Sequence, residues 1–112
     1  MAEFLNPFTG LTPDRKLTFR ELTRAVRLAV TAEEEAIHLY EALADATDNQ
    51  LAAKALQSVA DEERVHAGEF LRVLNLLLND EAAKLAEGAA EVDDLNKFAK
   101  PQEPPTVGNL RT

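Results

Sequence analysis

The stretch DEERVHAGEF (61–70) decides how this sequence is interpreted. It lies in a region whose apolar residues recur with helical spacing, at Ala52, Leu56, Val59, Phe70, Val73 and Leu77. The same rhythm of three and four residues leads through the stretch to Glu63 and His66. A carboxylate and an imidazole therefore occupy two positions where the pattern calls for apolar residues, and burial of unpaired ionisable groups is costly.

A second helical pattern precedes this one. Thr18 begins the sequence TFRE, in which Glu21 follows three residues later, and this capping-box pattern predicts a helix start. The apolar stripe that follows comprises Phe19, Leu22, Val26, Ala29, Ala36, Tyr40 and Leu43. The missing position in this rhythm is Glu33. Every interruption of the two stripes is thus a potential metal ligand.

The polar segment 45–49 separates the two helices, and we expect Asp48 to cap the second helix. Two long helices joined by a short turn pack antiparallel. Glu33 and Glu63 lie at equal sequence distances on either side of Asp48, so both should sit at one height along the hairpin. His66 follows Glu63 by one helical turn and shares its face. We therefore expect Glu33, Glu63 and His66 to converge.

Two buried carboxylates at one height repel each other, and each costs several kcal/mol by order of magnitude when it is unpaired. A bound cation would neutralise both carboxylates and also use the imidazole. Carboxylate and imidazole ligands suit iron, manganese or zinc, whereas calcium prefers oxygen alone. Glu34 and Glu35 adjoin Glu33, but the helical phase favours Glu33 as the ligand. His38 falls off the stripe and is expected at a surface or an interface.

The chain supplies only half of a known ligand set. Helical-bundle di-iron proteins use one Glu from each of two helices and Glu-x-x-His from each of the other two. Two copies of this chain would complete that set, so we predict a twofold dimer around a two-metal centre. The predicted fold class is all-α: an antiparallel two-helix hairpin, with a short third helix, that completes a four-helix bundle by dimerisation.

The composition limits the alternatives. A length of 112 residues predicts one small domain, and a net charge of −8 argues against nucleic-acid binding. The absence of cysteine excludes disulfides and thiolate metal sites. We find no signal-peptide pattern and no apolar run that approaches a membrane span.

The chain is expected to have three parts. Residues 1–17 are predicted to form an irregular lead-in, and residues 18–99 to form the helical domain. A third, weaker helix is predicted within 80–99, interrupted by Gly88 and with one apolar face that contains Val92, Leu95 and Phe98. Residues 100–112, KPQEPPTVGNLRT, have no helical periodicity and are predicted to form a flexible tail.

The sequence resembles the encapsulated ferritins, which are half-length ferritin-like proteins carried inside encapsulin nanocompartments. The resemblance rests on AEEEAIHLYEAL (32–43) and DEERVHAGEFL (61–71), and it covers the hairpin best. In the tail, TVGNLR (106–111) is similar to the cargo-loading peptide that docks such enzymes on the inner wall of the shell. Its residues are Thr106, Val107, Gly108, Asn109, Leu110 and Arg111.

This resemblance implies a role for each matching residue. Glu33, Glu63 and His66 match the ligands of a ferroxidase di-iron centre. Tyr40 matches a tyrosine that can hydrogen-bond a ligand carboxylate, and Glu35 matches an acidic position that lines the path of metal access in some members. The implied cofactor is iron, held by ligands from two chains.

The chain also departs from the family pattern. Ala32 stands where some members have a second acidic access residue, and Leu39 stands where some have tryptophan. The resemblance further implies a ring of five dimers, located in the cytoplasm inside an encapsulin shell. Apolar residues off the stripe are expected to contact other subunits of that ring, namely Leu28, Leu39, Leu71 and Leu78.

The expected function is that of a ferroxidase, which oxidises Fe(II) to Fe(III) and feeds iron storage in the shell. Two alternatives remain open at this point. One is a rubrerythrin-like peroxidase that receives electrons from a separate partner. The other is a non-catalytic module in which a metal ion only holds the dimer together. The residues alone do not separate the three functions, whereas the family resemblance favours the ferroxidase.

Overall fold

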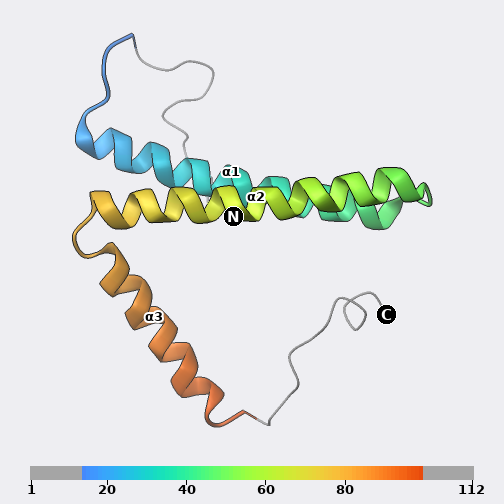
Figure 1. The fold of residues 1–112 in the computed structure, drawn as a ribbon. Helices are drawn as coiled ribbons and strands as arrows, with labels where there is room; N and C mark the ends of the chain where they lie inside the picture. The colour runs from blue at the N-terminus through green and yellow to red at the C-terminus, as the bar shows by residue number, and fades with distance from the viewer. Residues whose placement is uncertain (1–13, 100–112) are drawn as a thin grey trace, which may run out of the picture. The chain divides into compact units, whose positions relative to one another are not determined.

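A computed structural model describes residues 14–99 of the chain, and that range contains three helices and no strand (Figure 1). The helices are α1 (Phe19–Ala46), α2 (Gln50–Leu77) and α3 (Glu81–Asn96). The predicted all-α class is confirmed, and α1 and α2 pack side by side as a hairpin. Almost all of the predicted lead-in and the whole tail 100–112, with its Thr106–Arg111 peptide, lie outside the described residues.

The start of α1 is fixed by the predicted capping box. The Thr18 hydroxyl accepts a hydrogen bond from the Glu21 amide at 3.2 Å, and the Glu21 carboxylate accepts one from the Thr18 amide at 2.9 Å. Arg15 donates two further hydrogen bonds to this carboxylate, at 2.8 and 3.0 Å. The Arg15 guanidinium and the Thr18 amide together lower the pKa of Glu21 to about 2.

The turn between α1 and α2 differs from the prediction by one residue. The N-cap of α2 is Asn49, whose Oδ1 accepts a hydrogen bond from the Ala52 amide at 2.9 Å. The Asn49 amide in turn donates to the Thr47 hydroxyl at 3.1 Å. The prediction that Asp48 caps α2 is wrong, because it is the side chain of residue 49 that lies beside the free amides of the first turn. Both residue types are good caps, so the sequence alone does not separate them.

The interface within the hairpin does not use the apolar stripe that the sequence singled out. The buried residues of the two helices are Thr23, Ala44, Ala60, Ala67 and Leu74. Three of them recur every seven residues along α2, which is the spacing of an antiparallel helical pair. The small side chains let the helices approach closely, and Leu74 is the largest fully buried side chain.

The predicted apolar stripe lies on the neighbouring flank of each helix and stays partly exposed. Phe19 is 57% exposed, Val59 is 43% exposed and Val73 is 40% exposed. The stripe is therefore not the core of a single hairpin, and its predicted burial depends on the second copy that would complete a four-helix bundle. A helix in a four-helix bundle must cover two flanks, and a single hairpin can cover only one of them.

At the open end of the hairpin, an ion pair joins α1 to the residue that follows the turn after α2, and the sequence patterns did not predict it. Arg27 of α1 donates two hydrogen bonds to the carboxylate of Glu81, at 2.9 and 2.7 Å. The Glu81 side chain is only 12% exposed, and the Arg27 guanidinium lowers its pKa. Glu81 is the last residue of the hairpin unit as well as the first residue of α3.

The remainder of α3 belongs to a second unit, which begins at Ala82. The helix is shorter than the predicted range 80–99, and the apolar side chains Leu85, Val92 and Leu95 are exposed on it. Phe98 is also exposed, but it lies beyond the end of α3. None of the helices in the described range has the length and apolar character needed to span a bilayer.

Candidate metal centre

The structure brings Glu33, Glu63 and His66 together. One oxygen of each carboxylate and one ring nitrogen of the imidazole all lie within 4.8 Å of one another. His66 Nδ1 is 3.5 Å from Glu63 Oε2 and 3.8 Å from Glu33 Oε2. Within residues 14–99, no other group of three His, Asp or Glu side chains comes this close. The arrangement follows from helix geometry: Glu63 and His66 are one turn apart on α2, and α1 carries Glu33 past them at the same level.

The electrostatic environment of this cluster calls for a cation. The side chains of Glu33 and Glu63 are 18% and 19% exposed, whereas that of His66 is 44% exposed. Glu33 Oε2 is buried and accepts no hydrogen bond. A distance of 3.8 Å to the imidazole is too long for a hydrogen bond, so this oxygen carries an uncompensated desolvation cost of about 1–3 kcal/mol. A metal ion bound to the carboxylate would remove that cost.

The donor set fits a first-row transition metal. Two carboxylates and one imidazole combine hard anionic oxygens with a nitrogen ligand, as iron, manganese and zinc sites do. Three protein donors do not fill the coordination sphere of such an ion. The cluster also lies on the flank of the hairpin that is only partly covered, so a second set of ligands can approach it from outside this chain.

Tyr40 lies on the same apolar stripe, two turns from Glu33 toward the Thr47–Asn49 turn. It is half-buried and lines a groove of about 490 Å³ together with four apolar residues of α2, namely Ala52, Ala55, Leu56 and Val59. Among the described residues, Tyr40 makes no hydrogen bond to Glu33 or Glu63. The predicted hydrogen bond to a ligand carboxylate is therefore not present within one hairpin.

Glu35 does not join the cluster. Its side chain is exposed and lines a separate pocket of about 570 Å³ with Thr31, Glu34, His38 and Leu39. His38 is likewise exposed and off the stripe, where the sequence predicted it. Of the three adjacent glutamates, only Glu33 joins the cluster with Glu63 and His66, which is the residue that the helical phase favours.

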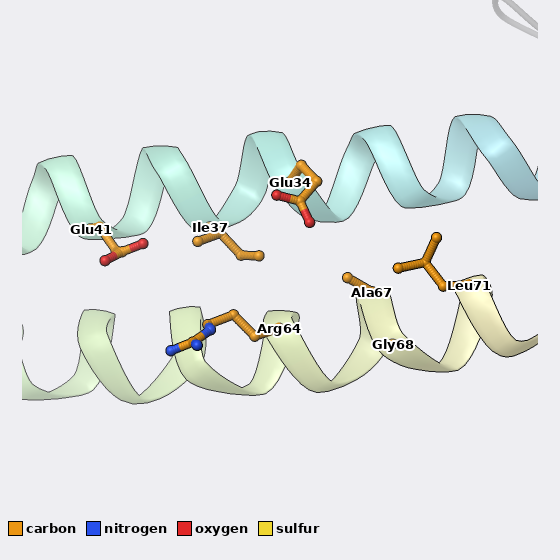
Figure 2. Close-up of a pocket in the computed structure, with 7 residues that line it drawn as sticks. All are labelled: Glu34, Ile37, Glu41, Arg64, Ala67, Gly68 and Leu71. Carbon is orange, nitrogen blue, oxygen red and sulfur yellow. The ribbon is translucent and has the colours of Figure 1, made fainter. Parts of the chain in front are cut away.

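A further groove of about 450 Å³ lies between the two helices on a different flank of the hairpin. Figure 2 shows Glu34, Ile37 and Glu41 of α1 facing Arg64, Ala67, Gly68 and Leu71 of α2. The three convergent residues do not line it. Its apolar floor and mixed charges distinguish it from the Glu33, Glu63 and His66 cluster.

The chain resembles known proteins in sequence and in fold. Residues 24–101 match the family described as Rubrerythrin. The chain is 42% identical over 103 residues to the encapsulin nanocompartment cargo protein EncC of Myxococcus xanthus, a match that covers 92% of this chain and 78% of that protein. It is 38% identical over 91 residues to the ferritin-like-encapsulin shell fusion protein of Pyrococcus furiosus, covering 81% of this chain and 26% of the fusion.

A solved structure also resembles this fold. The crystal structure of the encapsulated ferritin domain from Pyrococcus furiosus matches with a TM-score of 0.75 and 35% sequence identity. The match covers 88% of this chain and all of that domain.

Proposed function

The chain belongs to the rubrerythrin family and to the encapsulated ferritins, and on this basis we propose that it is a ferroxidase with a di-iron site shared by two copies. The observation that carries the proposal is the convergence of Glu33, Glu63 and His66 around a carboxylate oxygen that has no partner. Two copies would supply four carboxylates and two imidazoles, which is the ligand set of a helical di-iron centre.

The substrate of this reaction is Fe(II). Anionic oxygen ligands favour Fe(III) over Fe(II), so the carboxylates of Glu33 and Glu63 would promote the loss of an electron from each bound ion. Two Fe(II) ions then supply two electrons, which with two protons reduce dioxygen to hydrogen peroxide. With peroxide as the oxidant, the same electrons and protons yield water. His66 would bind one ion and fix its position relative to the two carboxylates.

The shared site explains why the apolar stripe is incompletely buried in one chain. Phe19, Val59 and Val73, which lie on the same stripe as the cluster, are 40–57% exposed. An extended apolar flank of this kind is typical of a surface that another protein covers. A second hairpin on this flank would bury the apolar side chains and exclude water from the metal centre. We further propose that five such dimers close into a ring.

The C-terminal tail is the part of the chain that we propose binds an encapsulin shell. One relative is named as an encapsulin cargo protein, and the other is named as a fusion of a ferritin-like part with an encapsulin shell. We propose that TVGNLR (106–111) of this chain binds the inner wall of an encapsulin shell. Iron oxidised at the dimer would then be stored inside the shell, in the cytoplasm.

A second candidate function follows from the family match itself. Because residues 24–101 match the family described as Rubrerythrin, peroxide reduction with electrons from a partner protein is the main alternative. A metal ion that only holds the dimer together is the other. Fast peroxide consumption with a reductant would favour the peroxidase. A dimer that retains zinc and oxidises iron slowly would favour the metal-stapled module.

The ferroxidase proposal is tested by replacing one proposed metal ligand at a time. Glu63→Ala and His66→Ala should each abolish Fe(II) oxidation, measured by the absorbance of Fe(III) after anaerobic loading and exposure to air, while circular dichroism retains the helical signal. Native mass spectrometry should show two irons per pair of chains for the wild type and the control below, and not for the two ligand variants. The matched control is Glu62→Ala, because Glu62 is exposed and adjoins Glu63. Oxidation at the full rate in either ligand variant would contradict the proposal.

A further inference from the structure

Two buried alanines bracket the ligands that α2 supplies to the cluster. Ala60 precedes Glu63 by one helical turn, and Ala67 directly follows His66. The two alanines are 0% and 5% exposed, so they form part of the contact between α2 and α1. The remaining buried residue of α2 is Leu74, near the open end of the hairpin. Helix α2 therefore presents small side chains to α1 at the level of the cluster and a larger one away from it.

The cluster is divided between the two helices, so its geometry depends on their separation. The distance of 3.5 Å between Glu63 Oε2 and His66 Nδ1 is set within α2, because the two residues are one turn apart. The distance of 3.8 Å between Glu33 Oε2 and His66 Nδ1 crosses from α1 to α2. Widening the hairpin changes the second distance and leaves the first unchanged. Glu33 is therefore the residue whose place in the cluster depends on the packing between helices.

The separation of the helices depends on the size of the side chains between them. Packed helix axes lie about 8–10 Å apart, and the side chains at the contact decide where in that range a pair falls. Larger side chains in a filled contact force the backbone to shift. A shift of about 1 Å exceeds the tolerance of a metal–ligand distance, which is about 0.2 Å. The Glu33 side chain is 18% exposed, which leaves it little freedom to extend and compensate.

We propose that Ala60 and Ala67 are positioning residues, whose small size holds α1 close enough to α2 for Glu33 to share a metal ion with Glu63 and His66. The proposal rests on the metal centre proposed above and identifies residues outside the ligand set that fix its geometry. Neither alanine side chain has a donor atom for a metal ion, so both act through the separation of the helices. Ala60 is fully enclosed, whereas Ala67 borders the groove of about 450 Å³ in Figure 2. A larger side chain is therefore harder to accommodate at position 60.

Binding of Co(II) tests this role without iron oxidation, because the visible absorption of Co(II) depends on the number and arrangement of its ligands. Ala60→Val should weaken Co(II) binding at least about 10-fold and change the Co(II) spectrum, and Ala67→Val should do so to a smaller extent. The matched control is Ala44→Val, at a buried alanine about three turns from Glu33. It should lower the Tm and leave the Co(II) affinity and spectrum unchanged. Ala60→Gly should also keep the affinity, because it weakens the helix without pushing the helices apart.

A double-mutant cycle shows whether Ala60 acts through Glu33. Glu33→Ala removes the ligand that α1 supplies, so Ala60→Val should weaken Co(II) binding no further in that background. Equal weakening in the presence and absence of Glu33 would overturn the proposal, and so would an equal effect of Ala44→Val. The Ala67→Val variant takes the place of Ala60→Val in the same cycle if the latter does not fold.

Failure of the metal centre itself gives a different result. A wild-type protein that binds no Co(II), or a Glu63→Ala variant that binds it with full affinity, would overturn the proposed metal centre. Wild-type binding that is lost in Glu63→Ala and unchanged in folded Ala60→Val and Ala67→Val would overturn only the positioning role of the two alanines.

Discussion

Replacement of Glu33 by leucine should make the metal-free protein more stable and at the same time remove its iron oxidation. Glu33 Oε2 is buried without a hydrogen-bond partner, and the nearest cationic candidate, His66 Nδ1, is 3.8 Å away. Position 33 continues an apolar stripe, so leucine suits the surroundings of this site when no metal is present. Under the proposed function, the same carboxylate is a ligand of iron, so its loss should remove oxidation.

The magnitude follows from the burial of this side chain. Relief of an unsatisfied buried oxygen contributes about 1–3 kcal/mol, and the apolar area of leucine adds about 1 kcal/mol in a site that is not fully covered. The Glu33 side chain is 18% exposed, which reduces both contributions. We therefore expect the free energy of unfolding to rise by about 1–3 kcal/mol. For a domain of this size, Tm should rise by at least about 4 °C.

Thermal unfolding followed by circular dichroism in EDTA measures the stability. The protomer concentration is held constant because the proposed dimerisation would be linked to folding. The matched control is Glu41→Leu, an exposed position on the same helix, where the change should stay within about 0.5 kcal/mol. Fe(II) oxidation should fall at least about 100-fold in Glu33→Leu and stay unchanged in the control. A Glu33→Leu protein that melts at or below the wild-type Tm would refute the reasoning about the unpartnered oxygen. Full oxidation activity would refute its role as a ligand.

Three further predictions concern the rest of the chain. Leu74→Ala should lower the free energy of unfolding by about 2–5 kcal/mol in urea titrations, because Leu74 is 1% exposed, whereas Leu76→Ala should change it little because Leu76 is 67% exposed. The Glu21 carboxyl should titrate near pH 2 by NMR, and Arg15→Ala should raise its titration midpoint. Because the pKa of Glu21 in the folded protein lies below the ordinary glutamate pKa, its contribution to stability is complete above the ordinary pKa and is lost as the pH falls toward 2. Deletion of 106–111 should leave iron oxidation intact and prevent co-purification with an encapsulin shell, and undiminished loading would contradict the role of the tail.

The candidate site was accessible from the sequence because it required only the geometry of single helices and the antiparallel packing that a short turn imposes. The two interrupted stripes identified Glu33, Glu63 and His66, and equal spacing about the turn placed Glu33 and Glu63 at one height. The structure brings the three residues within 4.8 Å. Asn49 displaced Asp48 as the cap of α2, since adjacent residues of similar chemistry compete for the same amides and only the path of the turn decides between them.

The ion pair between Arg27 and Glu81 illustrates what local patterns leave out. The two residues are far apart in the sequence, and neither breaks a periodicity or forms a motif. Their two hydrogen bonds, at 2.9 and 2.7 Å, depend on where the turn after α2 returns the chain to α1. A contact of this kind is set by the path of the whole chain.

The sequence by itself determined where α1 begins, the all-α class and which side chains share one stripe. These properties depend on hydrogen bonds and spacings within a few turns of one helix. Only the tertiary structure decided which flank the hairpin covers: Thr23, Ala44, Ala60, Ala67 and Leu74 are buried, while the apolar stripe with Glu33 stays partly open. Periodicity gives the direction of a side chain about its own helix axis. It does not determine which neighbouring helix packs there, because that depends on how closely the two helices approach, and here the small residues beside the stripe allow the closer contact.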